Sequence, residues 1–481
     1  MRLGPQITLD GFLAAGEGQA LDVPPDIYAR LQAARRVVED AAAGEAPVYG
    51  LNTGLGANLG YRIAPEDIPA FQRQLIAGRA VAVGPLLAPA TGRNMLLARI
   101  IGAALGHSGM SVAVFDHLCD VFRAGLSPGV PRYGSIGAAD LTQNATWAMA
   151  LLGEGQIWDG AVWREAGHAL AQVDLTPPAL QSKDAMALIN HSATTVADAA
   201  SALHAARRGL AMCQYAAVLS FEGYGANAEI FSPQINELRG SPGQAEMAAW
   251  FASHITNADP SRVQDALSFR TLAPVMGAAQ DALNRAIAIW EAELNGASDN
   301  PVVWGAEAMC STPNFHAPAL ALALEQVSLA MAMVGAGCVM RIQRLMNPDL
   351  TGLPRYLTPV GGASAGFVPL QKTAAALLGD IRRHAMPVVL DPSPVSDGVE
   401  DMAPMTAQAA RKLTDQMLPL HLLVGIEAVV AAQARDLRGL TATPLHDAIR
   451  EQVAMLHDDR MLGQDAAAAR NVLAVFAGRA V

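Results

Sequence analysis

The chain has 481 residues, of which 52% are hydrophobic and only 16% are charged, so it is long enough to bury a large core and to place apolar surface in subunit contacts. Its net charge is −11 without any Lys/Arg-rich block, which speaks against nucleic acid and anionic membranes as partners and favours a small-molecule substrate. The four cysteines lie far apart and no His, Asp or Glu group has metal-ligand spacing, so neither a disulfide framework nor a metal site is expected.

Apolar residues recur at three- and four-residue spacing along most of the chain, which is typical of packed helices. The helices predicted in this way are, in chain order, 26–43, 66–82, 92–107, 112–124, 140–153, 184–219, 264–296, 317–346, 366–383, 402–436, 442–457 and 464–478. Strand-like alternation is nearly absent, and short strands are expected only around Ile157–Val162. The predicted fold class is therefore all-α (mainly α), with a long central helical bundle.

Two domains are expected from the change in helix length. Residues 1–190 would form an N-terminal domain that carries active-site loops, and residues 191–481 the long-helix bundle with the C-terminal helices. The first residues lack the apolar core of a signal peptide. The apolar runs 317–340 and 418–434 are interrupted by polar residues, so we expect core helices of a cytoplasmic protein.

Polar, Gly- and Pro-rich breaks separate these helices and hold most of the unusual polar residues. The stretches of interest, most of them in these breaks, are VYGLNTGLG (48–56), VPRYGSIGAADL (130–141), ALIN (187–190), QDALSFR (264–270), LNGASDNP (294–301), PNFHA (313–317), RIQRLMNPDLTGLP (341–354), GASAGF (362–367) and VED (399–401). Their joint order and spacing resemble the histidine, phenylalanine and tyrosine ammonia-lyases, the aromatic amino acid lyase family. The resemblance covers nearly the whole chain.

The resemblance implies a cofactor loop, and this loop departs from the family pattern. Family members cyclise an internal Ala-Ser-Gly, with loss of two waters, to an electrophilic methylidene-imidazolone. The matching centre here is Gly137, Ala138, Ala139 and Asp140, which is one residue shorter and lacks the serine and the ring-closing glycine. Ser135 lies too early to replace that serine. We therefore expect a degenerate loop, no methylidene-imidazolone and no other cofactor.

Other departures fall in the same matched site. Leu267 stands where the family has its second catalytic tyrosine, and His191 replaces a glycine. The two-residue selectivity position reads Gly78-Arg79, which opens the distal end of the pocket and adds a fixed cation. A guanidinium there favours an anionic or strongly hydrogen-bonding group over a phenyl ring.

The remaining site residues are implied by the resemblance. Arg270 and Asn190 would hold the substrate carboxylate. Tyr49 would act as general base if nearby cations such as Arg79 lower its pKa, with His191 or Glu400 as its partner. The pocket would also be lined by Gln264, Asn314 and Phe315.

Structural roles remain open for several of these residues. Tyr49 is also compatible with a hinge whose hydroxyl caps a helix, and His191 with a hydrogen-bonded core histidine. Arg270 is also compatible with an ion pair to Glu400 or Asp401, and Arg79 with one to a neighbouring subunit.

The resemblance implies a homotetramer whose active sites combine loops of three subunits. We expect a carbon–nitrogen lyase-like enzyme that catalyses an elimination, addition or isomerisation on a small carboxylate-bearing amino acid or derivative. Without the electrophile, the substrate must bring a more acidic proton or a better leaving group. The alternatives are a conventional aromatic or histidine ammonia-lyase and a degenerate member that binds ligands or acts as a scaffold.

Overall fold

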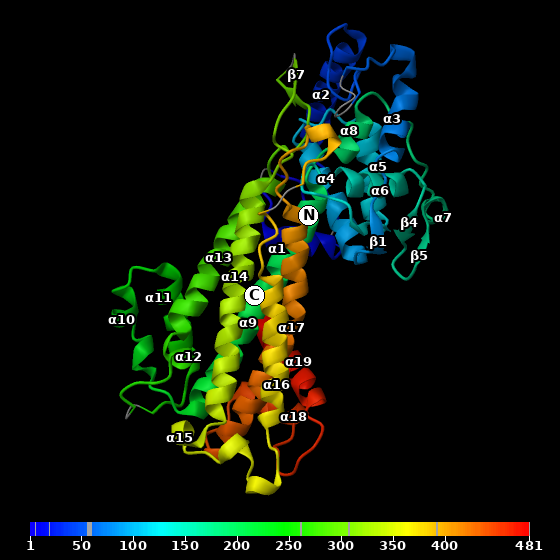
Figure 1. Cartoon of the computed structure of the whole chain (residues 1–481). Coiled ribbons are helices and arrows are strands. Elements are labelled where there is room, and N and C mark those ends of the chain that lie inside the picture. Colours follow the sequence, from blue (N-terminus) through cyan, green and yellow to red (C-terminus); the bar gives the residue numbers. More distant parts are fainter. Residues whose placement is uncertain are drawn as a thin grey trace. The chain divides into compact units, whose positions relative to one another are not determined.

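The computed structural model describes residues 1–4, 6–18, 20–54, 60–259, 262–305, 308–390 and 393–480. Leu55 and Gly56 of the 48–56 motif lie outside the described residues. The described part of the chain consists mostly of helices with a few very short strands, which confirms the predicted mainly α class (Figure 1).

The chain forms two compact units, and each of them is built from three separate stretches. Unit 1 comprises Met1–Ser201, Ile287–Leu322 and Pro387–Arg411, and unit 2 comprises Ala202–Ala286, Ala323–Met386 and Lys412–Val481. This division differs from the single expected boundary at residue 190, because α9, α13, α14 and α17 each have residues in both units.

Unit 1 contains shorter helices and all the strands. Its helices are α1 (Leu9–Gly16), α2 (Pro25–Ala43), α3 (Ile68–Ala77), α4 (Pro89–Ala104), α5 (Val112–Arg123), α6 (Leu141–Leu151), α7 (Ala166–Ala171) and α8 (Asp184–Ile189), with 3₁₀ helices η2 (Pro65–Asp67) and η6 (Ser396–Gly398). The antiparallel strand pairs join β1 (Val83–Leu86) to β3 (Pro131–Tyr133), β2 (Ser127–Pro128) to β4 (Gln156–Trp158), β4 to β5 (Trp163–Glu165), and β6 (Val302–Trp304) to β7 (Ala308–Cys310).

Helix α4 is the buried centre of unit 1. Most of its residues are buried, and a Cβ atom at Gly92 would lie 2.0 Å from the carbonyl oxygen of Pro128, so only glycine allows strand β2 to approach this closely. The indole of Trp147 on α6 donates to the Gly92 carbonyl at 3.3 Å. These contacts fix α6, which follows the degenerate loop directly.

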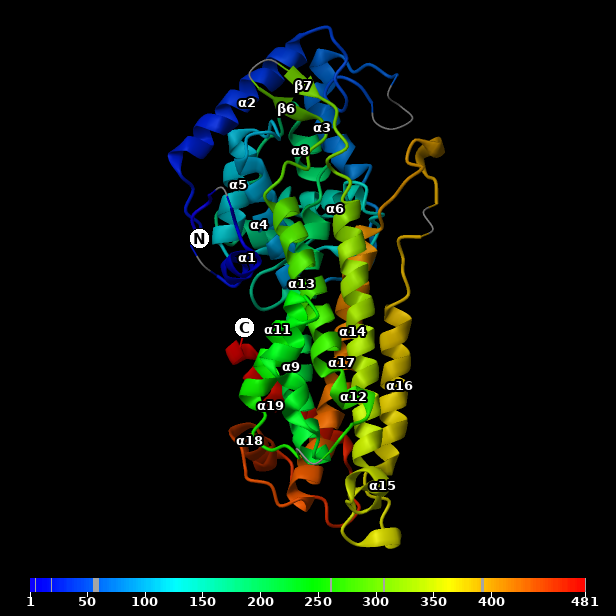
Figure 2. The same ribbon diagram turned by 90° about the vertical axis from the view of Figure 1, so that its left-hand side faces the viewer.

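Unit 2 is dominated by long helices. They are α9 (Ala193–Tyr224), α13 (Leu272–Leu294), α14 (Pro318–Leu345), α16 (Val368–His384) and α17 (Thr406–Leu437), and Figures 1 and 2 show them side by side in this unit. Shorter helices complete it: α10 (Pro233–Glu237), α11 (Pro242–His254), α12 (Leu267–Arg270), α15 (Pro348–Thr351), α18 (Pro444–Gln452), α19 (Gly463–Ala480), η3 (Ala228–Phe231), η4 (Arg355–Leu357) and η5 (Gly361–Ala363).

Small residues and buried ion pairs hold the long helices together. A Cβ atom at Gly223 of α9 would lie 3.0 Å from that of Ala434 on α17, so glycine permits the close approach of these two helices. Arg341 of α14 donates to both carboxylate oxygens of Glu427 on α17, at 2.5 and 3.0 Å, and both side chains are buried. A buried pair with this geometry fixes the register of two helices more than it adds to stability.

Within the part of the chain that the structure describes, helices α14 and α17 are long and apolar enough to cross a membrane by length and composition. In the structure, 56% of the apolar window of α14 and 78% of that of α17 are buried. This burial agrees with the expectation that both are core helices.

Candidate active site

The loop 134–140, which matches the family's cofactor loop, is ordered by hydrogen bonds to one buried carboxylate. Asp140 accepts from the Ser135 hydroxyl, and from the backbone N–H and the hydroxyl of Thr195 on α9 at 2.8 and 3.0 Å. Burial raises the pKa of Asp140, while its bonds from Ser135 and Thr195 act in the opposite direction. Ala139 and Asp140 have φ angles of 63° and 49°, which places both in the left-handed region that favours glycine.

Three other segments of unit 1 surround this loop. Ala138 forms a β-bridge with His316, and the N–H of Ala139 donates to the Phe315 carbonyl at 3.3 Å. The N–H of Met405 donates to the Ile136 carbonyl at 3.0 Å. A Cβ atom at Gly134 would lie 3.1 Å from that of Ala82, so the chain after Arg79 also passes close to the loop.

Arg79, Tyr49 and Glu400 form an electrostatic cluster in unit 1. Burial lowers the pKa of the Arg79 guanidinium, and the neighbouring Tyr49 and Glu400 raise it. All three residues are half-buried. Arg79 also donates to the Leu75 carbonyl at 3.2 Å, which ties it to the end of α3. The site therefore holds a phenol and a carboxylate within the field of one partly desolvated cation.

Asn190 lies at the end of α8, where the predicted helix 184–219 divides into α8 and α9. Its side chain is 5% exposed, and its amide nitrogen donates to the Asn300 carbonyl at 2.9 Å. Its carbonyl oxygen is buried without a hydrogen-bond partner among the described residues. A buried acceptor of this kind is normally satisfied, so this atom is free to accept a hydrogen bond from a ligand.

His191 has both ring nitrogens engaged in the helix break. Nε2 contacts the Leu188 carbonyl at 2.9 Å, and Nδ1 accepts from the N–H of Ala193 at 3.1 Å. Burial lowers the pKa of His191 well below its ordinary value, and the nearby Arg99 acts in the same direction. The geometry favours the structural role over the expected catalytic one, because a neutral ring with two occupied nitrogens cannot exchange a proton with substrate without breaking the helix cap.

Of the other expected binding residues, Asn314 and Phe315 belong to unit 1 and Gln264 and Arg270 to unit 2. Asn314 is exposed, and Phe315 is half-buried beside the loop. Arg270 donates to the amide oxygen of Gln264 at 2.8 Å, and both side chains are exposed. Arg270 and Gln264, two of the family-matched residues, thus lie together in one exposed region of unit 2.

Sequence reasoning missed a buried charged network that joins α6, α9 and α17. Arg411 on α17 donates to Asp198 on α9 at 2.9 Å and to the Gln143 amide oxygen on α6 at 2.7 Å. Burial raises the pKa of Asp198 to about 6, and Arg411 opposes this. The signal was a carboxylate and an arginine inside otherwise apolar helical stretches, where unpaired charges are rarely tolerated.

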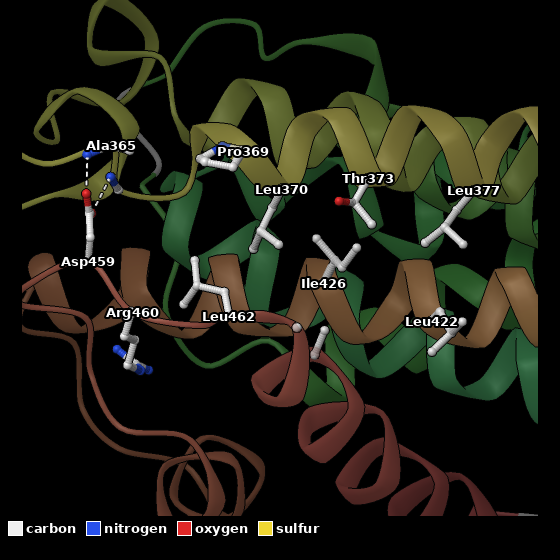
Figure 3. Close-up of a pocket in the computed structure, with 13 residues that line it drawn as sticks. Ala365, Pro369, Leu370, Thr373, Leu377, Leu422, Ile426, Asp459, Arg460 and Leu462 are labelled. Atoms are coloured by element: carbon white, nitrogen blue, oxygen red, sulfur yellow. Dashed lines mark hydrogen bonds between the residues drawn. The ribbon is translucent and has the colours of Figure 1, made fainter.

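A separate cavity of about 530 Å³ lies in unit 2 and contains none of the expected site residues. Figure 3 shows Leu370, Thr373 and Leu377 of α16 facing Leu422 and Ile426 of α17. At one end, Asp459 accepts from the backbone N–H of Ala365 at 2.8 Å. Because the lining is mainly apolar and the carboxylate is already hydrogen-bonded, this cavity has no apparent part in the chemistry.

Comparisons with known proteins identify the relatives of this chain. The profile of the family described as "Aromatic amino acid lyase" matches residues 7–455. A histidine ammonia-lyase of Paracidovorax citrulli is 35% identical over 472 residues, covering 95% of this chain and 92% of the relative. One from Rhodospirillum rubrum is 36% identical over 465 residues, covering 93% and 90%.

Solved structures give the same picture. The chain superimposes with a TM-score of 0.95 on the ergothioneine-degrading enzyme ergothionase of Treponema denticola, in complex with desmethyl-ergothioneine sulfonic acid, at 26% identity over 98% of both chains. Histidine ammonia-lyase of Trypanosoma cruzi gives a TM-score of 0.90 at 30% identity, covering 98% of this chain and 93% of that one.

These relatives contradict the expectation that the protein has no cofactor. The methylidene-imidazolone is the prosthetic group of the family, so the match to the family and to histidine ammonia-lyases implies it, and the expectation of its absence is wrong. The loop does not fit the usual route to that group, because neither Ala138 nor Ala139 carries the hydroxyl that leaves as water. The steps proposed here therefore use only the chain's own side chains.

The length of the family match and the identity of the relatives agree with the motif order in the sequence. Both support a carbon–nitrogen lyase rather than a degenerate scaffold. The chain belongs to the aromatic amino acid lyase family.

Proposed function

We propose that the protein eliminates an amine from a small imidazole-bearing amino acid derivative, with a trimethylammonium betaine of the ergothioneine type as its preferred substrate. The observation that supports this most is the cluster of Tyr49, Arg79 and Glu400, two of which lie a few residues along the chain from Ala82 and Met405, the residues that contact the loop 134–140. A base and a fixed cation are present there, while the centre of the loop offers only alanine side chains. These groups supply proton removal and recognition of the distal group, and a trimethylammonium substrate already carries a good leaving group.

The proposed step balances without any added reagent. The Tyr49 phenolate takes the β-proton, the C–H electrons form the α,β double bond, and the Cα–N bond breaks. A trimethylammonium group leaves as neutral trimethylamine and needs no proton from the enzyme. The products are an imidazolyl acrylate and the amine, and the proton remains on the Tyr49 hydroxyl. The Arg79 charge stabilises the phenolate before the transfer.

Arg79 is also proposed to recognise the distal end of the substrate. Ergothioneine carries sulfur on its imidazole ring, and the ligand bound to the Treponema ergothionase is a sulfonic acid. A guanidinium binds a thiolate or sulfonate through charge and directed hydrogen bonds, whereas an unsubstituted phenyl ring offers neither. Asn190 and Arg270 are assigned to the carboxylate end of the substrate by the family match.

The second candidate is histidine ammonia-lyase activity, which the relatives at 35% identity favour. Parallel assays with ergothioneine and histidine distinguish the two, with trimethylamine, ammonia and the near-ultraviolet absorbance of the acrylate as readouts. We expect kcat/KM at least about tenfold higher for ergothioneine, which corresponds to about 1.4 kcal/mol of transition-state discrimination. Faster release of ammonia from histidine would establish the second candidate instead. Absorbance and intact mass of the same sample would report the prosthetic group.

We further propose a homotetramer in which one site combines residues of different subunits. The family resemblance implies sites that combine loops of several subunits, and it assigns Tyr49 and Arg270 to one substrate. Mixing inactive Tyr49→Phe and Arg270→Met proteins, with reassembly, is expected to restore part of the activity. Mixtures without any recovered activity would argue that each chain completes its own site.

A further inference from the structure

Arg99 and Asp299 form a buried ion pair in unit 1. Arg99 of α4 donates from Nη1 to Oδ2 at 3.1 Å and from Nη2 to Oδ1 at 2.8 Å. The two side chains are only 1% and 2% exposed. This bidentate arrangement fixes the carboxylate in both distance and plane, which a single hydrogen bond does not do.

The pair anchors the turn Asp299–Asn300, and the turn holds two parts of the site. The Asn300 carbonyl accepts from the Asn190 amide at 2.9 Å. The Asn300 side-chain oxygen accepts from the N–H of Thr312 at 3.0 Å, and the Asp299 carbonyl accepts from the Thr312 hydroxyl at 2.8 Å. Asn190 and the segment that begins at Thr312 are therefore fastened to the same two residues.

The hydroxyl of Thr312 connects the Asp299–Asn300 turn to the expected pocket residues. This hydroxyl accepts from the backbone N–H of Asn314 at 3.4 Å. The carbonyl of the following residue, Phe315, accepts from the N–H of Ala139 in the loop. A continuous series of hydrogen bonds thus leads from the buried pair to Asn190 on one side and to the loop 134–140 on the other.

A buried ion pair of this kind is a poor choice for stability alone, because well-packed apolar residues in its place are often equally stable. It does supply fixed geometry. Active-site groups lose activity when displaced by about 1 Å, so an anchor shared by two site segments has a direct catalytic use.

We propose that Arg99 and Asp299 are positioning residues that set Asn190 and the Asn314–Phe315 segment relative to the loop 134–140, with Thr312 as the connecting residue. The inference rests on the proposed function only in taking Asn190 and Asn314–Phe315 as substrate contacts. It adds three residues, Arg99, Asp299 and Thr312, that touch no reacting atom.

The test compares Thr312→Val with Thr312→Ser in the full-length protein. Valine keeps the shape of the threonine side chain but removes the hydroxyl that bonds to the Asp299 carbonyl and to the N–H of Asn314. Serine keeps this hydroxyl. We expect kcat/KM for ergothioneine to fall roughly 3- to 10-fold per lost hydrogen bond in Thr312→Val, with a fall in Tm of at most a few degrees, and to recover in Thr312→Ser. The dissociation constant of the non-reacting sulfonic acid analogue, measured by calorimetry, should follow the same order.

The possible outcomes separate this inference from the proposed function. Kinetics and ligand affinity of Thr312→Val equal to those of the wild type would overturn it, as would a fall in Tm with unchanged kinetics in the folded fraction. A wild type that binds the analogue without turnover refutes the proposed function, and the affinities of the two variants still decide the positioning role. Asp299→Asn, which keeps the Thr312 contact, is expected to lower kcat/KM further where it folds.

Discussion

At the scale of single residues, the central question is how a phenol acts as a base near neutral pH. An ordinary tyrosine has a pKa near 10, so little phenolate is present unless a cation favours it. Arg79 is such a cation, and its charge interacts with Tyr49 in the same half-buried region. In the proposed mechanism Tyr49 and Arg79 act together, so a change in either is expected to affect proton removal.

Tyr49→Phe is expected to lower kcat by about 10²- to 10⁴-fold, the range usual for loss of a general base. Binding of the sulfonic acid analogue should change little, because phenylalanine preserves the ring. Steady-state kinetics and calorimetry measure the two effects. Tyr61→Phe, an exposed tyrosine in the same N-terminal region, is the matched control and should leave both unchanged. Turnover by Tyr49→Phe at the wild-type rate would contradict the assignment.

Lys183 is a buried residue whose charge interacts with Arg99 and Asp299, and we expect it to make the stability of the protein depend on pH. Burial lowers its pKa from 10.5 to about 8, Asp299 and Asp184 oppose this, and Arg99 and Arg35 reinforce it. Between pH 8 and pH 10.5 the unfolded chain binds more protons than the folded chain. The free energy of unfolding therefore rises with pH across this range, and the contribution of Lys183 to it is lowest below pH 8.

Lys183→Met removes the titrating group. The difference in free energy of unfolding between the wild type and this variant (wild type minus variant) should therefore rise by up to about 3 kcal/mol from pH 8 to pH 10.5. Denaturant unfolding at several pH values measures this difference. The loss of the bond from Lys183 to the Ser108 carbonyl adds a constant offset and does not change the slope. A difference that is flat across this window would contradict the prediction.

The residues that the sequence analysis proposed and those that it missed depend on different kinds of information. Tyr49, Asn190 and Glu400 follow from family-matched motifs, which place them without any knowledge of packing. Asp299 lies in the LNGASDNP stretch (294–301), and the sequence does not link it to Arg99, because this partner lies 200 positions earlier in the chain. His191 shows the opposite case, since its local sequence does not reveal that Leu188 and Ala193 occupy its ring.

At the scale of elements, the loop 134–140 is shaped by tertiary contacts. Gly137 has a φ of 80°, and a Cβ atom there would lie 2.8 Å from the backbone nitrogen of Thr406. Both the conformation and the space require glycine. The loop and the start of α17 are consequently coupled, and a displacement of one moves the other.

Gly137→Ala is expected to destabilise the protein by more than the roughly 1–2 kcal/mol that a left-handed alanine alone costs, and to lower kcat/KM. The matched control is Gly240→Ala, which has a φ of 67° and no atom within 4 Å of the added Cβ. Thermal and denaturant unfolding of both variants isolate the steric part. Equal destabilisation of the two would show that Thr406 moves aside freely.

Helices were predictable where their apolar periodicity was uninterrupted, as in α2 and α16. The prediction of one continuous helix over 184–219 was wrong, since the helix is interrupted at Asn190–Ser192. The amide of Asn144 on α6 donates to the carbonyls of Ile189 and His191, both at the break, at 3.0 and 2.8 Å. A break fastened from another helix has no local sequence signal, and the position of Asn190 depends on it.

At the scale of the whole molecule, helix α14 has apolar residues that the single chain leaves exposed. Leu322, Leu329, Met333 and Met340 are 61%, 51%, 55% and 38% exposed, at successive spacings of seven, four and seven residues. Spacings of seven and four place them along one face of a helix, as in the seam between packed helices. Such a face favours burial against another subunit, in line with the proposed tetramer.

The double variant Leu329→Glu, Met333→Glu is therefore expected to form smaller assemblies than the wild type, because burying two carboxylates at a helix seam costs several kcal/mol. Light scattering after size-exclusion chromatography measures the mass, and circular dichroism shows whether the helices persist. Met461→Glu, at an 82% exposed methionine outside α14, is the control and should keep the wild-type mass.

Activity should fall together with the mass, because Tyr49 and Arg270 are proposed to meet only in the assembled protein. A fully active variant of reduced mass would refute the shared site, and an unchanged mass would remove α14 from the interface.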